Sequence, residues 1–175
     1  MNAKQAQLTE KIRDVPDFPK PGIVFKDITP LLQDGESFLL ACDLLAEPYE
    51  PGSIDLVVGI ESRGFIFAPP VALRLGAGFA PARKSGKLPW KTVGETYQLE
   101  YGEDRIELHQ DAVRAGQRVL IVDDVVATGG TAAATAKLVR AMGGELVGQS
   151  FLIEIGFLGG RELLSGPNVH TVLKF

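Results

Sequence analysis

The sequence predicts an α/β fold with a mainly parallel sheet flanked by helices. Buried strand patterns alternate with helical patterns along most of the chain. In addition, two of the strands lead through a short glycine-containing loop directly into a helix, at residues 55–75 and 118–142. Because ligands bind beyond the carboxyl ends of parallel strands, we expect both loops at one edge of the sheet.

The composition is that of a single globular domain. The chain has 175 residues, is 45% hydrophobic and 23% charged, and carries a net charge of −4. No basic excess suggests a nucleic-acid partner, and no apolar run reaches the ~20 residues of a membrane span. One cysteine, Cys42, fits a reducing compartment, and the N-terminus has no apolar signal core. We therefore expect a cytoplasmic protein in which Cys42 is a buried structural thiol.

The N-terminal region is expected to hold two helices with an irregular segment between them. Residues 3–13 place Leu8 and Ile12 on one helical face, and residues 36–47 form an amphipathic pattern. Residues 16–22 contain three prolines and a glycine, which predict a loop rather than a helix or a strand.

The first strand–loop–helix unit follows. Residues 55–60 predict a buried strand and residues 65–75 a helix. The loop between them reads Glu61-Ser62-Arg63-Gly64. Its arginine can hold a phosphate group through two parallel hydrogen bonds, although a plain surface arginine is the alternative. Pro69 and Pro70 lack N–H groups, so we expect this helix to begin late or to bend.

A basic segment follows a short strand at residues 78–83. It places four cations within nine residues of a net-acidic chain: Arg83, Lys84, Lys87 and Lys91. Such clusters are usually solvated surface loops. Here glycine, proline and the exposed-looking Trp90 favour a mobile lid that meets a highly anionic ligand. Residues 96–101 and 105–109 are expected to pair as two strands beyond it.

The second unit combines an anion site with an acidic pair. Residues 119–122 predict a buried strand, Asp123 and Asp124 follow, and residues 132–142 predict a helix. Between them lies Ala127-Thr128-Gly129-Gly130-Thr131. Its glycines let backbone N–H groups approach a phosphate, the helix start adds partial positive charge, and the acids suit hydroxyls or a hydrated cation.

Common nucleotide loops fit this segment poorly. A Walker A loop needs a lysine after its last glycine, and a dinucleotide fingerprint needs separated glycines. A ribose 5-phosphate fits better, while an ordinary strand–turn–helix with surface acids is the alternative. The rest of the chain predicts a helical turn at 110–115, a strand at 145–155, a short helix at 158–164 and a final strand at 170–175. We assign no role to either histidine.

Residues 118–131 closely resemble the phosphoribosyl-diphosphate (PRPP) motif of the type I phosphoribosyltransferases. The resemblance extends over nearly the whole chain, including residues 18–32, 58–65 and 99–102. It implies that residues 1–175 form a single domain of that fold. In it, residues 1–35 would be a hood over the base and residues 84–101 a flexible catalytic lid.

The resemblance is greatest to the adenine-specific members, which convert adenine and PRPP to AMP and diphosphate in purine salvage. It implies ribose and 5-phosphate binding by Asp123, Asp124, Ala127, Thr128, Gly129, Gly130 and Thr131. It implies diphosphate binding by Glu61, Ser62, Arg63, Arg83, Lys84 and Lys87. It implies an adenine pocket formed by Val24, Phe25, Lys26, Arg63 and Ile155. Glu100 would be the catalytic residue that exchanges a proton with adenine N7, and Tyr101 would close over the site.

The resemblance also implies a Mg²⁺ cofactor held by substrate and water, and a homodimer in which Arg83 reaches the partner's site. Small molecules would be the partners, with no role for nucleic acid or membrane. Two alternatives remain open. Another enzyme of this superfamily would use a different base, but the hood and the Leu99-Glu100-Tyr101 segment favour adenine. A PRPP-sensing regulator would need a DNA-binding domain, and the short N-terminal region is not basic.

Overall fold

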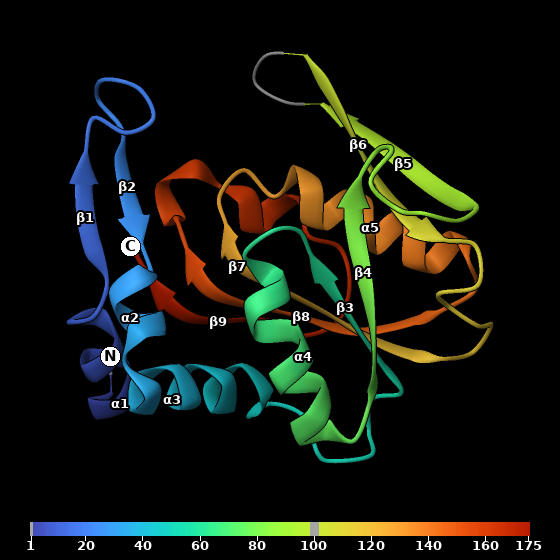
Figure 1. Cartoon of the computed structure of the whole chain (residues 1–175), viewed down its shortest axis with the longest axis horizontal. Helices are drawn as coiled ribbons and strands as arrows, with labels where there is room; N and C mark the ends of the chain where they lie inside the picture. Colours follow the sequence, from blue (N-terminus) through green and yellow to red (C-terminus); the bar gives the residue numbers. More distant parts are fainter. Residues whose placement is uncertain (1, 99–101) are drawn as a thin grey trace. The chain divides into compact units, whose positions relative to one another are not determined.

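The computed structural model describes residues 2–98 and 102–175, which divide into two compact units (Figure 1). The first unit is Met1–Leu44 and the second is Leu45–Phe175. Within the described ranges, no helix is both long and apolar enough to cross a membrane.

The first unit contains a strand pair that the sequence analysis missed. Its elements are α1 Ala3–Thr9, β1 Arg13–Pro16, β2 Val24–Asp27, α2 Thr29–Gln33 and most of α3 Gly35–Ala46. The expected helix over residues 3–13 is too long, because Arg13 already begins a strand that pairs antiparallel with β2. Two cross-strand ion pairs stabilise this arrangement, Arg13 with Asp27 and Lys26 with Asp14, both at 2.6 Å.

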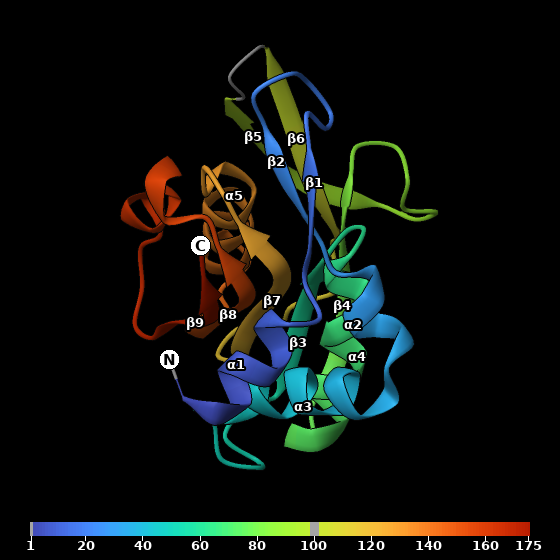
Figure 2. The same cartoon turned by 90° about the vertical axis from the view of Figure 1, so that its left-hand side faces the viewer.

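The second unit is built on a seven-stranded sheet with the order β5-β6-β4-β3-β7-β8-β9. The strands from β4 to β9 in this order are parallel, while β6 runs antiparallel to both β4 and β5, so the prediction of a mainly parallel sheet is confirmed. The strands are β3 Leu56–Ile60, β4 Gly78–Lys84, β5 Thr92–Gln98, β6 Glu103–His109, β7 Arg118–Val126, β8 Glu145–Glu154 and β9 Val169–Lys174. The antiparallel arm of β5 and β6 projects beyond the parallel strands (Figure 2).

The strand order fixes where a ligand can enter. α4 Gly64–Leu75 connects β3 to β4, and α5 Gly130–Ala141 connects β7 to β8. β3 and β7 are adjacent, parallel strands, but the chain crosses from β3 toward one edge of the sheet and from β7 toward the other edge. Since such crossovers are right-handed, the two helices must cover opposite faces, and Figure 1 shows α4 in front of the sheet and α5 behind it. The loops after β3 and β7 therefore diverge and open a crevice.

The central strands hold this crevice rigidly. Val57 and Val58 of β3 and Leu120 and Ile121 of β7 are completely buried. β3 and residues 119–122 of β7 are continuous runs without polar side chains, as is typical of parallel strands whose two faces are covered by helices. The edge of the sheet where the two loops emerge is therefore the least deformable part of the unit.

Several expected boundaries need correction. Pro69 and Pro70 predicted that α4 begins late or bends; it begins at Gly64, so the late start is wrong, and the bend stays a prediction. β7 does not end at residue 122 but continues through the acids, because Asp123 and Val125 pair with Phe151 and Ile153 of β8. β5 begins at Thr92, four residues before the start of the strand expected over 96–101.

Three further segments differ in detail. α5 begins at Gly130, two residues before the expected start. Residues 110–115 form turns and bends instead of a helical turn. The expected helix over 158–164 is two short 3₁₀ turns, η1 Gly156–Leu158 and η2 Gly160–Leu163, because Gly159 between them has a left-handed backbone. The expected burial of Cys42, within α3, is confirmed.

Candidate active site

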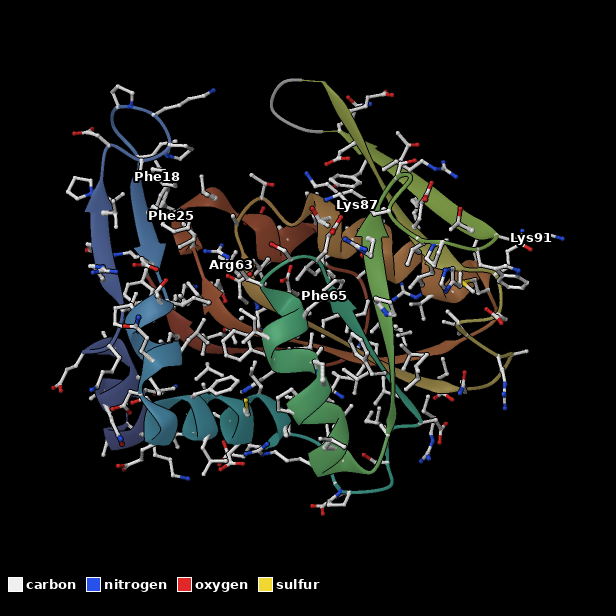
Figure 3. The ribbon with its side chains drawn as sticks, viewed as in Figure 1. Phe18, Phe25, Arg63, Phe65, Lys87 and Lys91 are labelled. Atoms are coloured by element: carbon white, nitrogen blue, oxygen red, sulfur yellow. The ribbon has the colours of Figure 1, made fainter. Side chains whose placement is uncertain are left out.

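A cavity of about 320 Å³ lies beyond the ends of β3 and β7. Its lining joins the two loops predicted from sequence: Glu61, Ser62, Arg63, and residues 123–132. Arg63 precedes the first turn of α4, where Figure 3 places it near the end of the helix. The expectation that both loops meet at one edge of the sheet is therefore confirmed.

Asp123 and Asp124 place two carboxylates side by side at this edge. Asp123 Oδ1 accepts a hydrogen bond from the backbone N–H of Asp124 at 2.8 Å. Burial raises the pKa of Asp123 well above its usual value, and the neighbouring charge of Asp124 adds to the effect. Burial also raises the pKa of Asp124, although the charge of Arg63 opposes it. The pair is therefore poised to accept hydroxyl donors or a cation.

Arg63 binds one of these acids directly. Its Nε lies 2.8 Å from Asp124 Oδ2, and the Asp124 side chain is only 6% exposed. The positive charge of Arg63 favours the ionised form of this buried carboxylate, and the contact fixes the direction of the guanidinium. The ion pair thereby connects the loop after β3 to the loop after β7.

Gly64 allows the two loops to approach so closely. A Cβ atom on Gly64 would lie 2.7 Å from Asp123 Oδ1 and 3.0 Å from the carbonyl oxygen of Val122. No side chain fits there without moving α4 or β7. The glycine of the first loop is therefore a packing requirement of the acid pair.

The second loop has the form of an anion site. Gly129 precedes α5 with φ +81°, and no side chain caps the N-terminus of this helix. The backbone N–H groups of the first turn are thus available to a ligand, with the helix dipole behind them. Among the described residues that line the cavity, Arg63 is the only lysine or arginine. A phosphate bound at residues 127–131 would therefore depend on backbone geometry and the Thr128 and Thr131 hydroxyls.

The basic turn after β4 is held by Glu61, which comes from the first loop. Glu61 accepts hydrogen bonds from Arg83 Nε at 3.2 Å and from the Lys84 backbone N–H, and Lys87 Nζ lies 3.3 Å away. Burial alone would raise the pKa of Glu61, but hydrogen bonds from Lys84, Lys87 and Arg83 outweigh it and the pKa lies below its usual value. A carboxylate repels a diphosphate, so Glu61 is better interpreted as the group that arranges these cations.

Other contacts shape the same turn. Glu107 is buried and accepts hydrogen bonds from Ser85 Oγ at 2.8 Å and from the backbone N–H of Gly86 at 3.2 Å. Lys84 Nζ lies 2.9 Å from Asp104 Oδ2. Trp90 is half-exposed and its ring meets the edge of His109. Together with Glu61 after β3, the β6 carboxylates of Glu107 and Asp104 thus hold the turn from the two strands that flank β4. Figure 3 shows Lys87 beyond the end of β4.

The residues expected to bind adenine belong to both units. Val24, Phe25 and Lys26 lie on β2 of the first unit, where Phe25 meets Phe18 edge-on with ring centroids 5.2 Å apart (Figure 3). Ile155 lies at the end of β8, and its N–H bonds the carbonyl oxygen of Val126 at 3.0 Å. Their contact with a base stays a prediction. Glu100 and Tyr101 lie outside the described residues, as does Leu99.

Sequence reasoning missed Tyr97. Its hydroxyl donates to Asp104 Oδ2 at 3.3 Å, and a Cβ on Gly130 would lie 3.3 Å from its ring. Burial raises the pKa of Tyr97, and a hydrogen bond with Thr131 opposes that rise. Tyr97 thus joins the β5–β6 arm to the anion loop. Its place in an alternating strand pattern concealed this contact.

The comparisons agree with this geometry. The phosphoribosyl transferase domain family matches residues 30–156. An adenine phosphoribosyltransferase of Anaeromyxobacter sp. is 55% identical over 175 residues, covering 100% of this chain and 99% of its own length. One from Thermobifida fusca is 60% identical over 161 residues, with 92% of each chain covered.

Solved structures give the same result. Adenine phosphoribosyltransferase from Rhodothermus marinus has a TM-score of 0.94 at 56% identity, covering 99% of this chain and 100% of its own. The enzyme from Saccharomyces cerevisiae, in complex with adenine and an imino-altritol bisphosphate, has a TM-score of 0.92 at 41% identity. The match covers 98% of this chain and 99% of the yeast chain. The chain therefore belongs to the phosphoribosyltransferase family, and within it to the adenine phosphoribosyltransferases.

Proposed function

We propose that this chain transfers the 5-phosphoribosyl group of PRPP to adenine, giving AMP and diphosphate for purine salvage. The observation that carries the proposal is the cavity that Arg63, the acid pair and the anion loop of residues 127–131 line together, with Arg63 paired to Asp124. PRPP has a phosphate at one end, a diphosphate at the other and two hydroxyls between them. The cavity brings together an arginine, an acid pair and an anion loop, which gives each of these substrate groups a candidate partner.

In the reaction, the bond between ribose C1 and the diphosphate oxygen breaks, and its electron pair leaves with the diphosphate. Adenine N9 forms the new bond to C1. The transition state carries positive charge on the ribose, which the carboxylates of Asp123 and Asp124 favour while they hold its hydroxyls. Residues 127–131 anchor the 5-phosphate, so that binding energy far from C1 positions the reacting carbon.

The leaving group needs cations. Arg63, Arg83, Lys84 and Lys87 would supply them, and Glu61 and Glu107 hold the turn that carries three of these. Magnesium would be held by the substrate and water, and the Asp123 and Asp124 carboxylates that line the cavity could accept hydrogen bonds from that water. A magnesium ion bound with the substrate would neutralise the leaving diphosphate.

The base would be handled by residues from several segments. Glu100 would take the proton from adenine N7, since a carboxylate within reach of the base can act in this way. Val24, Phe25, Lys26, Arg63 and Ile155 would form the adenine pocket, and Tyr101 would close over it. With residues 84–101 acting as a lid and residues 1–35 as a hood, water would be kept from the ribose cation.

Three further properties belong to this proposal. The enzyme would act as a homodimer in which Arg83 reaches the partner's site, and the chain would form one functional domain. It would work in the cytoplasm, as its single cysteine and small-molecule substrates suggest.

A base-competition assay tests the proposal. PRPP and Mg²⁺ are supplied with adenine, hypoxanthine, guanine or xanthine, and nucleotide formation is followed. Formation of AMP alone is the expected result. Product from a 6-oxopurine would mean that the base assignment is wrong, and PRPP binding without any product would support the regulator alternative.

A further inference from the structure

We infer that the ion pair between Arg161 and Glu154 is a positioning element for the 5-phosphate loop, acting through Gly160. This inference rests on the proposed function and deepens it, because it concerns how one end of the substrate is recognised.

The 3₁₀ segment Gly156–Leu163 packs directly on the anion loop. A Cβ atom on Gly129 would clash with the carbonyl oxygen of Gly160, and a Cβ on Gly160 would clash with that of Ala127. The backbones therefore touch with no space for a side chain on either. Gly160 is buried, so this contact forms the outer wall of the loop.

The loop needs such a wall. Its phosphate affinity would come from backbone N–H groups and hydroxyls, since Arg63 is the sole lysine or arginine among the described cavity-lining residues. Hydrogen bonds of this kind depend steeply on distance and angle, whereas a long cationic side chain could adjust. A displaced loop would therefore lose phosphate affinity even with all its residues present.

Glu154 and Arg161 hold the 3₁₀ segment in place. Arg161 Nη1 donates to Glu154 Oε2 at 3.0 Å, and Nη2 donates to the carbonyl oxygen of Val169 at 2.6 Å. Glu154 is 5% exposed and also accepts from Thr171 Oγ1 and Lys174 Nζ, each at 3.0 Å. One buried carboxylate at the end of β8 thus ties the residue after Gly160 to the sheet.

Lys174 provides a matched control. It donates to the same carboxylate and carries the same charge, but it comes from β9 and lies outside the 3₁₀ segment. Arg161→Met and Lys174→Met each keep an apolar stem and remove one positive charge. Only the first removes hydrogen bonds that a residue of the 3₁₀ segment makes, because Lys174 meets the segment through its methylene stem at Gly156 and methionine keeps that stem.

The experiment measures two affinities by calorimetry, for ribose 5-phosphate and for magnesium diphosphate. Arg161→Met is expected to weaken ribose 5-phosphate binding by about tenfold and to leave diphosphate binding unchanged. Lys174→Met is expected to change neither. The inference is wrong if Arg161→Met keeps full ribose 5-phosphate affinity, if it weakens both ligands equally, or if Lys174→Met behaves like it.

Gly160→Ala is a second route that leaves the ion pair in place. Its methyl group would press on Ala127, so the same selective loss is expected, and unchanged ribose 5-phosphate affinity would overturn the inference even if Arg161→Met does not fold. Failure of the proposed function would give a different result, because the unaltered chain would then form no AMP from adenine and PRPP.

Discussion

At the scale of single residues, the buried carboxylate of Asp123 lowers the stability of the fold and has a proposed role in catalysis. Its pKa is raised in the folded chain, mainly by burial, relative to its usual value of about 3.9 in the unfolded chain. Between these two pKa values the folded state binds more protons, so stability falls as the pH rises through that window. Above that window the charge is fully present, and the folded state carries the full cost of burying it.

Asp123→Asn should therefore stabilise the protein while it disables the site. An asparagine Oδ1 can still accept the Asp124 N–H, but it removes the repulsion between the two acids. The melting temperature should rise at pH 7, by about 2–4 °C for each kcal/mol of repulsion removed, and the gain should shrink toward pH 4. Turnover should fall by roughly tenfold or more, with little change in adenine binding. Unchanged turnover would remove Asp123 from the mechanism.

Glu100→Gln tests the proposed proton acceptor. The substitution keeps size and hydrogen bonding but removes basicity, so kcat should fall by about 10² or more in a steady-state assay. A drop of less than about twofold would make Glu100 a spectator. Because the change is neutral in volume, the melting temperature serves as the control for folding.

Residues near the chemistry could be predicted from sequence because their pattern is short and local. Asp123, Asp124 and residues 127–131 all lie in one continuous stretch, and the cavity unites them as expected. Tyr97 and Gly160 could not be predicted. Each reaches the loop from another part of the chain, and nothing in a tyrosine within a strand or a glycine within a turn indicates which backbone it touches.

At the scale of elements, the start of α4 must pack against β7 for the acid pair to form. Gly64→Ala should push these elements apart, since its Cβ would lie 2.7 Å from Asp123 Oδ1. We expect kcat/KM to fall by about tenfold or more.

Gly76→Ala is the matched control at the other end of the same helix. Gly76 has φ +67° and open space around its Cβ position, so alanine there should cost about 1–2 kcal/mol in stability through backbone strain. Its activity should stay within about twofold of the original. Equal activity losses in both variants would show that α4 acts through stability alone.

Regular elements with a clear period were predicted well, and their ends were not. The strand predicted over 55–60 differs from β3 by one residue at its start, and the helix predicted over 36–47 differs from α3 by one residue at each end. β7 was cut short because acidic residues look unlike a buried strand, yet pairing with β8 carries the strand past them. The β1–β2 pair was missed because prolines at 16, 19 and 21 suggested a loop, and its stability comes from cross-strand ion pairs.

At the scale of the whole molecule, the homodimer can be tested together with the shared site. Sedimentation should give twice the mass of one chain, and a monomer would contradict the proposal. If Arg83 serves the partner's site, mixing inactive Arg83→Met and Asp123→Asn chains should restore about one quarter of the original sites. No recovery in a confirmed mixed dimer would show that each chain uses its own Arg83, which here pairs with Glu61 of the same chain.

The anion loop at residues 127–131 has a consequence for mutagenesis. In the proposed function its ligand groups are main-chain amides and the Thr128 and Thr131 hydroxyls, and Gly129 and Gly160 leave no space for a methyl group. Alanine scanning would therefore give misleading results in this region. Ala127 is already alanine, and at Gly129 and Gly160 an alanine would introduce a steric clash instead of removing a ligand contact. Ester replacement of single backbone amides, by semisynthesis, would remove one donor at a time without adding an atom. Under the proposed function the main chain would make most contacts with the sugar phosphate, and side-chain substitutions would not measure them.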